Sequence, residues 1–170
     1  MIDRFFDKVR GESIADIQQI GIVEIEAGIS EITTFHTHVF IIFDSIKLKF
    51  ESINQYSKLL FRTVEEIKFE IEVEEEMIPV KSSIAEIVLN DTMGDNRVSS
   101  IDIYGLELND DKNYICDAIS LHLACGQELF FDPTYLFGIN IGGQRQKNLW
   151  MENFPNSPSK SILKKSIELI

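Results

Sequence analysis

Apolar and polar residues alternate over several short stretches of the chain, which is the pattern of a half-buried β-strand. In residues 67–76 (IKFEIEVEEE), the apolar Phe69, Ile71 and Val73 alternate with glutamates. A helix would place Phe69 far round its axis from Ile71, whereas a strand places all the apolar residues on one side. We therefore predict a strand here. Pro79 should end this strand or place it at a sheet edge, because proline cannot donate a hydrogen bond to the ladder.

Further strands are predicted wherever β-branched and aromatic residues gather between turn formers. They cover residues 20–26, 35–43, 46–50, 83–89, 98–108, 114–124 and 128–131. Gly28 and the pair Asp44-Ser45 are predicted turns, and residues 90–100 a loop. The stretch 114–124 (YICDAISLHLA) is apolar at both odd and even positions, which indicates a central strand covered on both faces.

Helical spacing of apolar residues predicts helices at residues 2–10 and 52–65. Asp132-Pro133 has the form of a helix cap followed by proline at the first helical position, which predicts a short helical turn ending at Gly138. Residues 142–158 are predicted to be a loop, and Ser157-Pro158 to open a last helix.

Together these elements predict an α+β fold. We expect a mainly antiparallel, twisted sheet of about six or seven strands with a few flanking helices. The 170 residues favour one domain covering residues 1–170. Hydrophobic residues make up 44% of the chain, which supplies enough material for a substantial core.

The net charge of −12 limits the classes of partner that the chain can bind. Nucleic acids and anionic membranes are disfavoured, because binding to phosphates needs clustered Lys and Arg. The charge suits either a basic protein partner or solubility alone. No apolar run is long enough to span a membrane, and the N-terminus (MIDRFFDKVRGES) lacks the apolar segment of a signal peptide, so we expect a cytoplasmic protein.

His36 and His38 form an H-x-H pair in the predicted strand 35–43. On a regular strand both rings point the same way, with Cα atoms about 6.6 Å apart. Such a pair can serve a metal ion if another strand supplies a third ligand. No E-x-x-H or third-histidine motif accompanies it, so two ordinary strand histidines are the other interpretation, and we predict no metal site.

The two cysteines, Cys116 and Cys125, are too few for a disulfide framework. We expect both to be buried and unreactive. On a straight strand, Cys116 and His122 would be about 20 Å apart, too far to act together. The glycines of residues 138–143 (GINIGG) match no phosphate loop, and we expect them to turn the chain or to let backbones approach closely. We predict neither a catalytic residue nor a cofactor.

The strongest remaining feature is the acidic stripe, which consists of Glu70, Glu72, Glu74, Glu75 and Glu76. Lys47 and Lys49 alternate with apolar residues in the stretch IKLKF, and this stretch could lie beside the stripe as a neighbouring strand. Cross-strand pairs of opposite charge contribute about 0.2–1 kcal/mol each. Two lysines cannot neutralise five glutamates, so the stripe is a candidate surface for a basic protein.

Residues 126–143 (GQELFFDPTYLFGINIGG), together with Trp150, resemble the C-terminal parts of small bacterial immunity proteins. Those proteins accompany contact-dependent growth-inhibition toxins or related polymorphic toxins. The resemblance covers about a tenth of the chain and carries over no site residue. It implies a cytosolic protein that binds and blocks one cognate toxin, often a basic nuclease.

Three functional hypotheses follow. The first is an inhibitory protein that binds a basic toxin domain through an acidic surface. The second is a metal-dependent enzyme or metal-binding protein that uses His36 and His38. The third is a structural protein that associates with itself through a sheet edge, and the sequence leaves the oligomeric state open.

Overall fold

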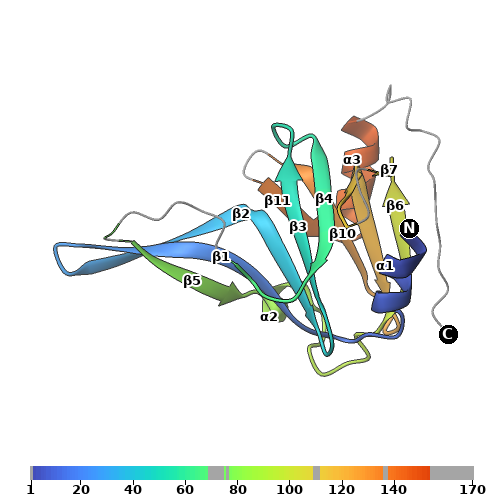
Figure 1. The fold of residues 1–170 in the computed structure, drawn as a ribbon, viewed down its shortest axis with the longest axis horizontal. Coiled ribbons are helices and arrows are strands. Elements are labelled where there is room, and N and C mark those ends of the chain that lie inside the picture. Colours follow the sequence, from blue (N-terminus) through green and yellow to red (C-terminus); the bar gives the residue numbers. More distant parts are fainter. Residues whose placement is uncertain (1, 69–74, 76, 109–111, 136–137, 154–170) are drawn as a thin grey trace.

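Two antiparallel β-sheets pack face to face in the computed structural model of the chain, which describes residues 2–68, 75, 77–108, 112–135 and 138–153 (Figure 1). The larger sheet has seven strands in the order β5-β1-β2-β3-β4-β8-β7. The smaller sheet has four strands in the order β11-β10-β9-β6. This arrangement confirms the predicted α+β class with mainly antiparallel strands, but the strands form two sheets and not the one sheet that was expected.

The seven-stranded sheet comprises β1 (Ile14–Glu26), β2 (Ile29–Phe43), β3 (Lys47–Ile53), β4 (Lys58–Val64), β5 (Met77–Ser83), β7 (Glu107–Leu108) and β8 (Tyr114–Cys116). The four-stranded sheet comprises β6 (Val98–Tyr104), β9 (Ala118–Leu123), β10 (Glu128–Tyr135) and β11 (Gly138–Gly142). The helices within the described residues are α1 (Ile2–Val9), α2 (Ala85–Val88) and α3 (Gln144–Asn153).

The main core lies between the sheets, and aromatic residues from both sheets meet there. Phe50 of β3 stacks on Phe131 of β10 with ring centroids 4.6 Å apart. Helix α1 closes the core from one side with Phe5, Phe6 and Val9, as its helical spacing predicts. A buried aliphatic or aromatic side chain is worth about 1.5–3 kcal/mol, so this shared interior holds the two sheets together.

One long hairpin crosses from one sheet to the other. Strands β6 and β7 run along β9 and β8, and the register stays continuous while the chain bends at Gly105 and Asp117. Gly105 has φ +60°, and a Cβ atom there would overlap the Asp117 carboxylate. The Asp117 amide donates to the carbonyl of Tyr104 at 2.7 Å. Across the bend the core-facing positions change from even to odd, because Tyr114 and Cys116 of β8 and Ile119, Leu121 and Leu123 of β9 all belong to the main core. The predicted single strand 114–124 is therefore wrong, since this apolar stretch forms two strands in two sheets.

Helix α3 forms a third layer on the outer face of the smaller sheet. Trp150 is its buried anchor and packs against Tyr104, Ala118 and Phe130 in a separate small cluster. The predicted loop over residues 142–158 is therefore wrong for Gln144–Asn153. The sequence QRQKNLWMEN has little apolar periodicity, because a single tryptophan anchors the helix.

The predicted helix over residues 52–65 is also wrong, because this stretch forms a hairpin. β3 and β4 pair from Lys47↔Val64 to Ile53↔Lys58. Asn54, Gln55 and Tyr56 all have positive φ between 52° and 63°. Three successive left-handed residues cannot continue a right-handed helix, so the chain reverses here.

Two short elements also differ from their predictions. Residues 83–89 contain the one-turn helix α2 rather than a strand, with Ala85 and Leu89 buried four residues apart. Asp132-Pro133 starts no helix, because β10 continues through it to Tyr135. The Asp132 carboxylate still accepts the Thr134 amide at 2.9 Å, but it does so at an irregularity between β10 and β11, a place where a strand tolerates proline.

Candidate functional site

A three-stranded arm projects from the sandwich (Figure 1). It consists of residues 20–26 of β1, 29–35 of β2 and 77–81 of β5, which pair in one regular register. Ala27 and Gly28 form its tip, both with positive φ, as a tight two-residue hairpin turn requires. The predicted turn at Gly28 and the predicted edge position of Pro79 are confirmed, since β5 is an edge strand.

One face of the arm carries glutamates. Glu24 lies directly opposite Glu31 in the register, and Glu26 follows on the same face towards the tip. Directly opposite side chains have Cβ atoms about 4.5–5.5 Å apart, and like charges there are destabilising. Within the described part of the chain, no Lys, Arg or His forms an ion pair with these three carboxylates.

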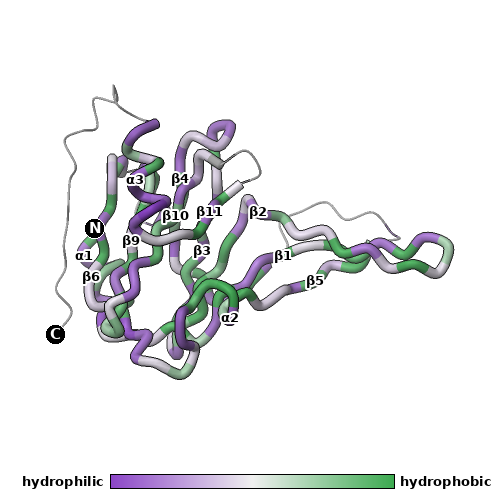
Figure 2. The backbone as a smooth tube through the Cα atoms, turned by 180° about the vertical axis from the view of Figure 1, so that it is seen from behind, coloured by the Kyte–Doolittle hydropathy of each residue, from purple (hydrophilic) through white to green (hydrophobic). Residues whose placement is uncertain are grey.

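The opposite face of the arm carries exposed isoleucines. Val23 pairs with Ile32 on β2 and with Ile78 on β5, and Ile25 follows towards the tip. Ile25 is 57% exposed, Ile32 68% and Ile78 50%. The alternation of hydrophobic and hydrophilic residues continues along the arm (Figure 2). Exposed isoleucines at neighbouring positions are typical of an interaction surface.

The predicted acidic stripe lies almost wholly outside the described residues. Glu70, Glu72, Glu74 and Glu76 fall there, and Glu75 is described and exposed. The expected ladder between IKLKF and the stripe does not form, because β2 and β4 occupy both edges of β3. In the pairing of β2, β3 and β4 that does form, Lys49 lies between Phe40 and Arg62. Its ammonium is 3.0 Å from a Glu51 oxygen.

His36 and His38 lie at an irregularity in β2, not in a regular ladder. The register with β1 jumps from Gln19↔Val39 to Ile20↔Phe35. His36 Nδ1 is 3.2 Å from the side-chain Nε2 of Gln19, and His38 Nε2 is 3.7 Å from Glu51 Oε1. Among the described residues, no three His, Cys, Asp or Glu side chains are grouped closely enough to hold a metal ion.

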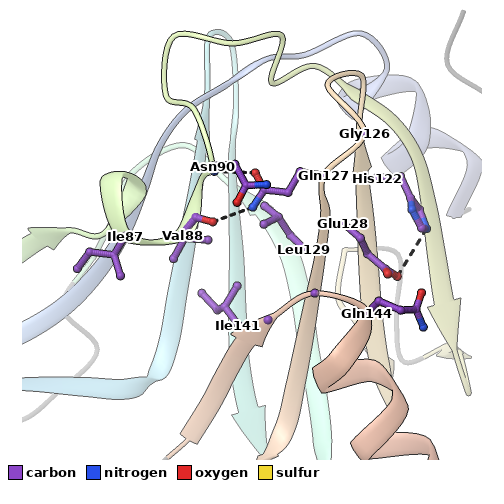
Figure 3. A pocket seen from close by; sticks show the side chains of 12 residues that line it. Ile87, Val88, Asn90, His122, Gly126, Gln127, Glu128, Leu129, Ile141 and Gln144 are labelled. Carbon is purple, nitrogen blue, oxygen red and sulfur yellow. Dashed lines mark hydrogen bonds and ion pairs between the residues drawn. The ribbon is translucent and has the colours of Figure 1, made fainter.

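A second polar region lies beside a hollow of about 690 Å³ at one end of the smaller sheet (Figure 3). His122 and Glu128 line the hollow, and the His122 ring lies 4.0 Å from the Glu128 carboxylate. His122 Nε2 is 3.1 Å from buried Asp102. Glu128 also accepts hydrogen bonds from Ser120 and from Lys147 of α3, both at 2.8 Å.

These contacts attach α3 to the sheet. Burial alone would raise the pKa of Glu128, but the hydrogen bonds from Lys147 and Ser120 outweigh it, so the pKa lies below its ordinary value of 4.5. Burial would lower the pKa of Lys147, but its bonds to Glu128 and Tyr104 raise it overall. The Ser120 hydroxyl donates to Glu128 and not to His122, so the cluster does not provide a serine activated by histidine.

The cysteines differ in their surroundings. Cys116 is buried as expected, and burial raises the pKa of its thiol well above the ordinary value. Cys125 is exposed, so the expectation that it is buried is wrong. Cys116 lies in β8 and His122 in β9, on either side of the bend between the two sheets.

The fold and the arm define a two-sheet sandwich with a projecting, two-faced β-ribbon. The chain matches no family model, and comparison with curated proteins and with solved structures found no significant similarity. No helix in the described ranges is long and apolar enough to cross a membrane. The arm glutamates had a weak signal in the sequence, since Glu24 and Glu26 alternate with apolar residues, but nothing there placed Glu31 opposite Glu24.

Proposed function

We propose that this chain is a cytoplasmic immunity or inhibitor protein that binds and neutralises a basic toxin domain, with the arm as its main contact. The observation that carries the proposal is the pairing of Glu24 with Glu31 on a projecting ribbon. The fold retains two like charges in direct opposition, at a cost of a few tenths of a kcal/mol or more. A cationic side chain from a partner, placed between them, would turn this repulsion into attraction.

The overall charge and the opposite face of the arm support the same proposal. The net charge of −12 steers a basic protein towards the chain and raises the association rate. The exposed Ile25, Ile32 and Ile78 supply apolar area that a partner can bury, at about 25 cal/mol per Å². Charge thus contributes to orientation and rate, and the isoleucines contribute to affinity.

The test compares two charge-reversed proteins in the native cell. The arm variant carries Glu24→Lys, Glu26→Lys and Glu31→Lys, and the control carries Asp7→Lys, Glu86→Lys and Glu152→Lys, which are exposed positions on the helices. Both variants change the net charge equally. We expect a basic protein to co-purify with the wild type and the control but not with the arm variant. An acidic partner, or equal recovery with both variants, would contradict the proposal.

Inhibition is tested separately with the recovered partner. Production of the partner alone should stop growth of a sensitive strain, and co-production of the wild-type chain should restore it. The arm variant should fail to restore growth. A third variant, with Glu72→Lys, Glu74→Lys and Glu75→Lys, tests whether the acidic stripe contributes, and full protection by that variant would remove the stripe from the proposal.

A further inference from the structure

The arm has two edges, and they differ in how they are protected. The outer edge of β5 carries Pro79 and Lys81. Proline and lysine are residues that proteins use to stop other strands from pairing with an edge. The outer edge of β2 along Ile29–Phe35 carries neither residue.

Among the described residues, this β2 edge is unpaired along most of the arm. β3 pairs with β2 only between His38 and Ile42. At His36 and Thr37, Gly138 of β11 lies against the β2 backbone, so closely that a Cβ atom there would overlap the His36 carbonyl. From Ile29 to Phe35 no described strand pairs with the outer side of β2.

The tip fixes which backbone groups face outward. Glu26 and Ile29 flank a two-residue turn, so they form a hydrogen-bonded pair. Because the register is regular as far as Ile20↔Phe35, the odd-numbered residues of β2 bond to β1. The amides and carbonyls of Ser30, Ile32 and Thr34 therefore point to the open edge.

We propose that the basic partner adds an extended strand to this edge of β2. The inference rests on the proposed function and specifies the chemistry of the partner segment. Beside Glu31 the added strand would carry Lys or Arg, and beside the exposed Ile32 it would carry apolar residues. Backbone hydrogen bonds then supply affinity, and the alternating side chains supply specificity. The partner segment is thus an alternating basic and apolar β-strand.

A second copy of this chain fits the edge less well. Two β2 edges paired with each other would bring the acidic faces of two arms together, where like charges repel. Light scattering at the peptide-binding concentration should show a monomer. A dimer that disappears when Ile32→Lys is introduced would overturn the proposal in favour of self-pairing.

The binding test uses two synthetic peptides that share the same alternation of apolar and charged residues. The basic probe is IKFKIKVKKK, and the control is IKFEIEVEEE, which is the chain's own sequence at residues 67–76. Fluorescence anisotropy with the full-length protein should show binding of the basic probe and at least about tenfold weaker binding of the acidic one. Equal affinity of the two peptides would overturn the proposed charge matching.

N-methylation of the basic probe separates strand addition from simple charge attraction. One derivative is methylated at the apolar residues and another at the alternate lysines, so each blocks one set of backbone donors. Strand addition predicts that only one derivative loses affinity, by about threefold to tenfold per lost hydrogen bond. If both derivatives bind as the parent does, strand addition is overturned while the acidic face remains a binding surface.

Amide hydrogen exchange locates the added strand. On binding of the basic probe, exchange at Ser30, Ile32 and Thr34 should slow, because these donors gain partners. Exchange at Glu31 and Thr33 should change little, since their amides already bond to β1. Protection at β5 in place of β2 would overturn the assignment of the edge.

Discussion

Charged side chains are paired with opposite charges in the sandwich, whereas in the arm two like charges face each other. In the sandwich, Lys58 lies between two carboxylates, 2.7 Å from Asp117 and 2.6 Å from Glu107. Burial would lower the pKa of Lys58, but the bonds to these carboxylates raise it overall. In the arm, by contrast, two glutamates oppose each other across the register.

Apolar residues show the same contrast. Residues such as Phe50 and Phe131 are enclosed between the sheets, whereas Ile25, Ile32 and Ile78 of the arm are exposed. Exposed apolar residues that gather on one surface are typical of an interaction site. We therefore expect the stability of this protein to reside in the sandwich, and we propose the arm as the element that binds a partner.

The largest expected effect tests where stability resides. Phe50→Ala removes a fully buried ring that stacks on Phe131 across the two sheets. We expect the free energy of unfolding to fall by about 3–5 kcal/mol, because a cavity remains. Urea denaturation measures it. Ile32→Ala on the arm is the control and should change stability by less than about 0.5 kcal/mol, and similar losses in the two variants would erase the contrast.

A second substitution tests the junction between the sandwich and the arm. Gly138 has φ +121° and lies against the backbone of His36 and Thr37, with 2.7 Å from an added Cβ to the Thr37 nitrogen. Gly138→Ala should destabilise the protein by about 2–3 kcal/mol, through backbone strain and overlap together. This position fits the prediction that the GINIGG glycines let backbones approach closely.

The matched control for the junction is Gly126→Ala. Gly126 also has positive φ, at +89°, but a Cβ atom there has open space around it. Gly126→Ala should lower the free energy of unfolding by about 1 kcal/mol, because only the unfavourable backbone conformation contributes. Thermal unfolding of both variants gives the difference, and equal losses would show that β11 and β2 are not tightly packed.

A third prediction concerns the ion pair that holds α3. Lys147→Met keeps most of the side-chain stem but removes the ammonium beside Glu128. We expect a loss of about 1–2 kcal/mol at pH 7, because a largely buried carboxylate loses its charged donor. Urea midpoints at several pH values measure the loss.

The pH dependence of this pair has a definite sign. The pKa of Glu128 is lower in the folded protein than its ordinary value of 4.5. Its stabilising contribution is therefore present above about pH 4.5 and is lost as pH falls through the folded pKa. The difference between the wild type and Lys147→Met should shrink in that acidic range, and a constant difference would show that packing of the lysine stem, not charge, holds α3.

Local sequence patterns predicted much of the sandwich. Alternation in IKLKF correctly predicted that Leu48 and Phe50 face the core. Helical spacing correctly predicted the helix α1. The hairpin turn at residues 54–56 was not predicted, because its left-handed residues include no glycine that would mark a turn in the sequence. Helix α3 was not predicted, because a single tryptophan anchors it. The residues that contact this tryptophan come from three strands that are distant in sequence.

The arm could be predicted only in part, for a different physical reason. The strand carrying Glu24 and Glu26 followed from local alternation. The opposition of Glu24 and Glu31 depends on register, and register is set by the two-residue turn at Ala27-Gly28. A turn one residue longer would have placed Glu31 opposite a different residue.

The smallest expected effect bears most directly on the arm. Glu31→Lys places an ammonium opposite Glu24 and converts a repulsive cross-strand pair into an attractive one. We expect the free energy of unfolding to rise by about 0.2–1 kcal/mol, and the rise should shrink in high salt because the pair is near water. The same substitution should weaken binding of the basic probe peptide, because Glu31 is then lost as its contact.

Glu26→Lys is the matched control, because Glu26 lies opposite Ile29 and so has no carboxylate across the register. It changes the net charge of the arm equally but should leave stability almost unchanged. A stability gain at Glu31 without one at Glu26 would show that the arm retains a specific repulsion that binding can relieve. Equal gains at both positions would instead attribute the effect to the overall charge of −12, and the arm would then be no more specialised than the rest of the surface.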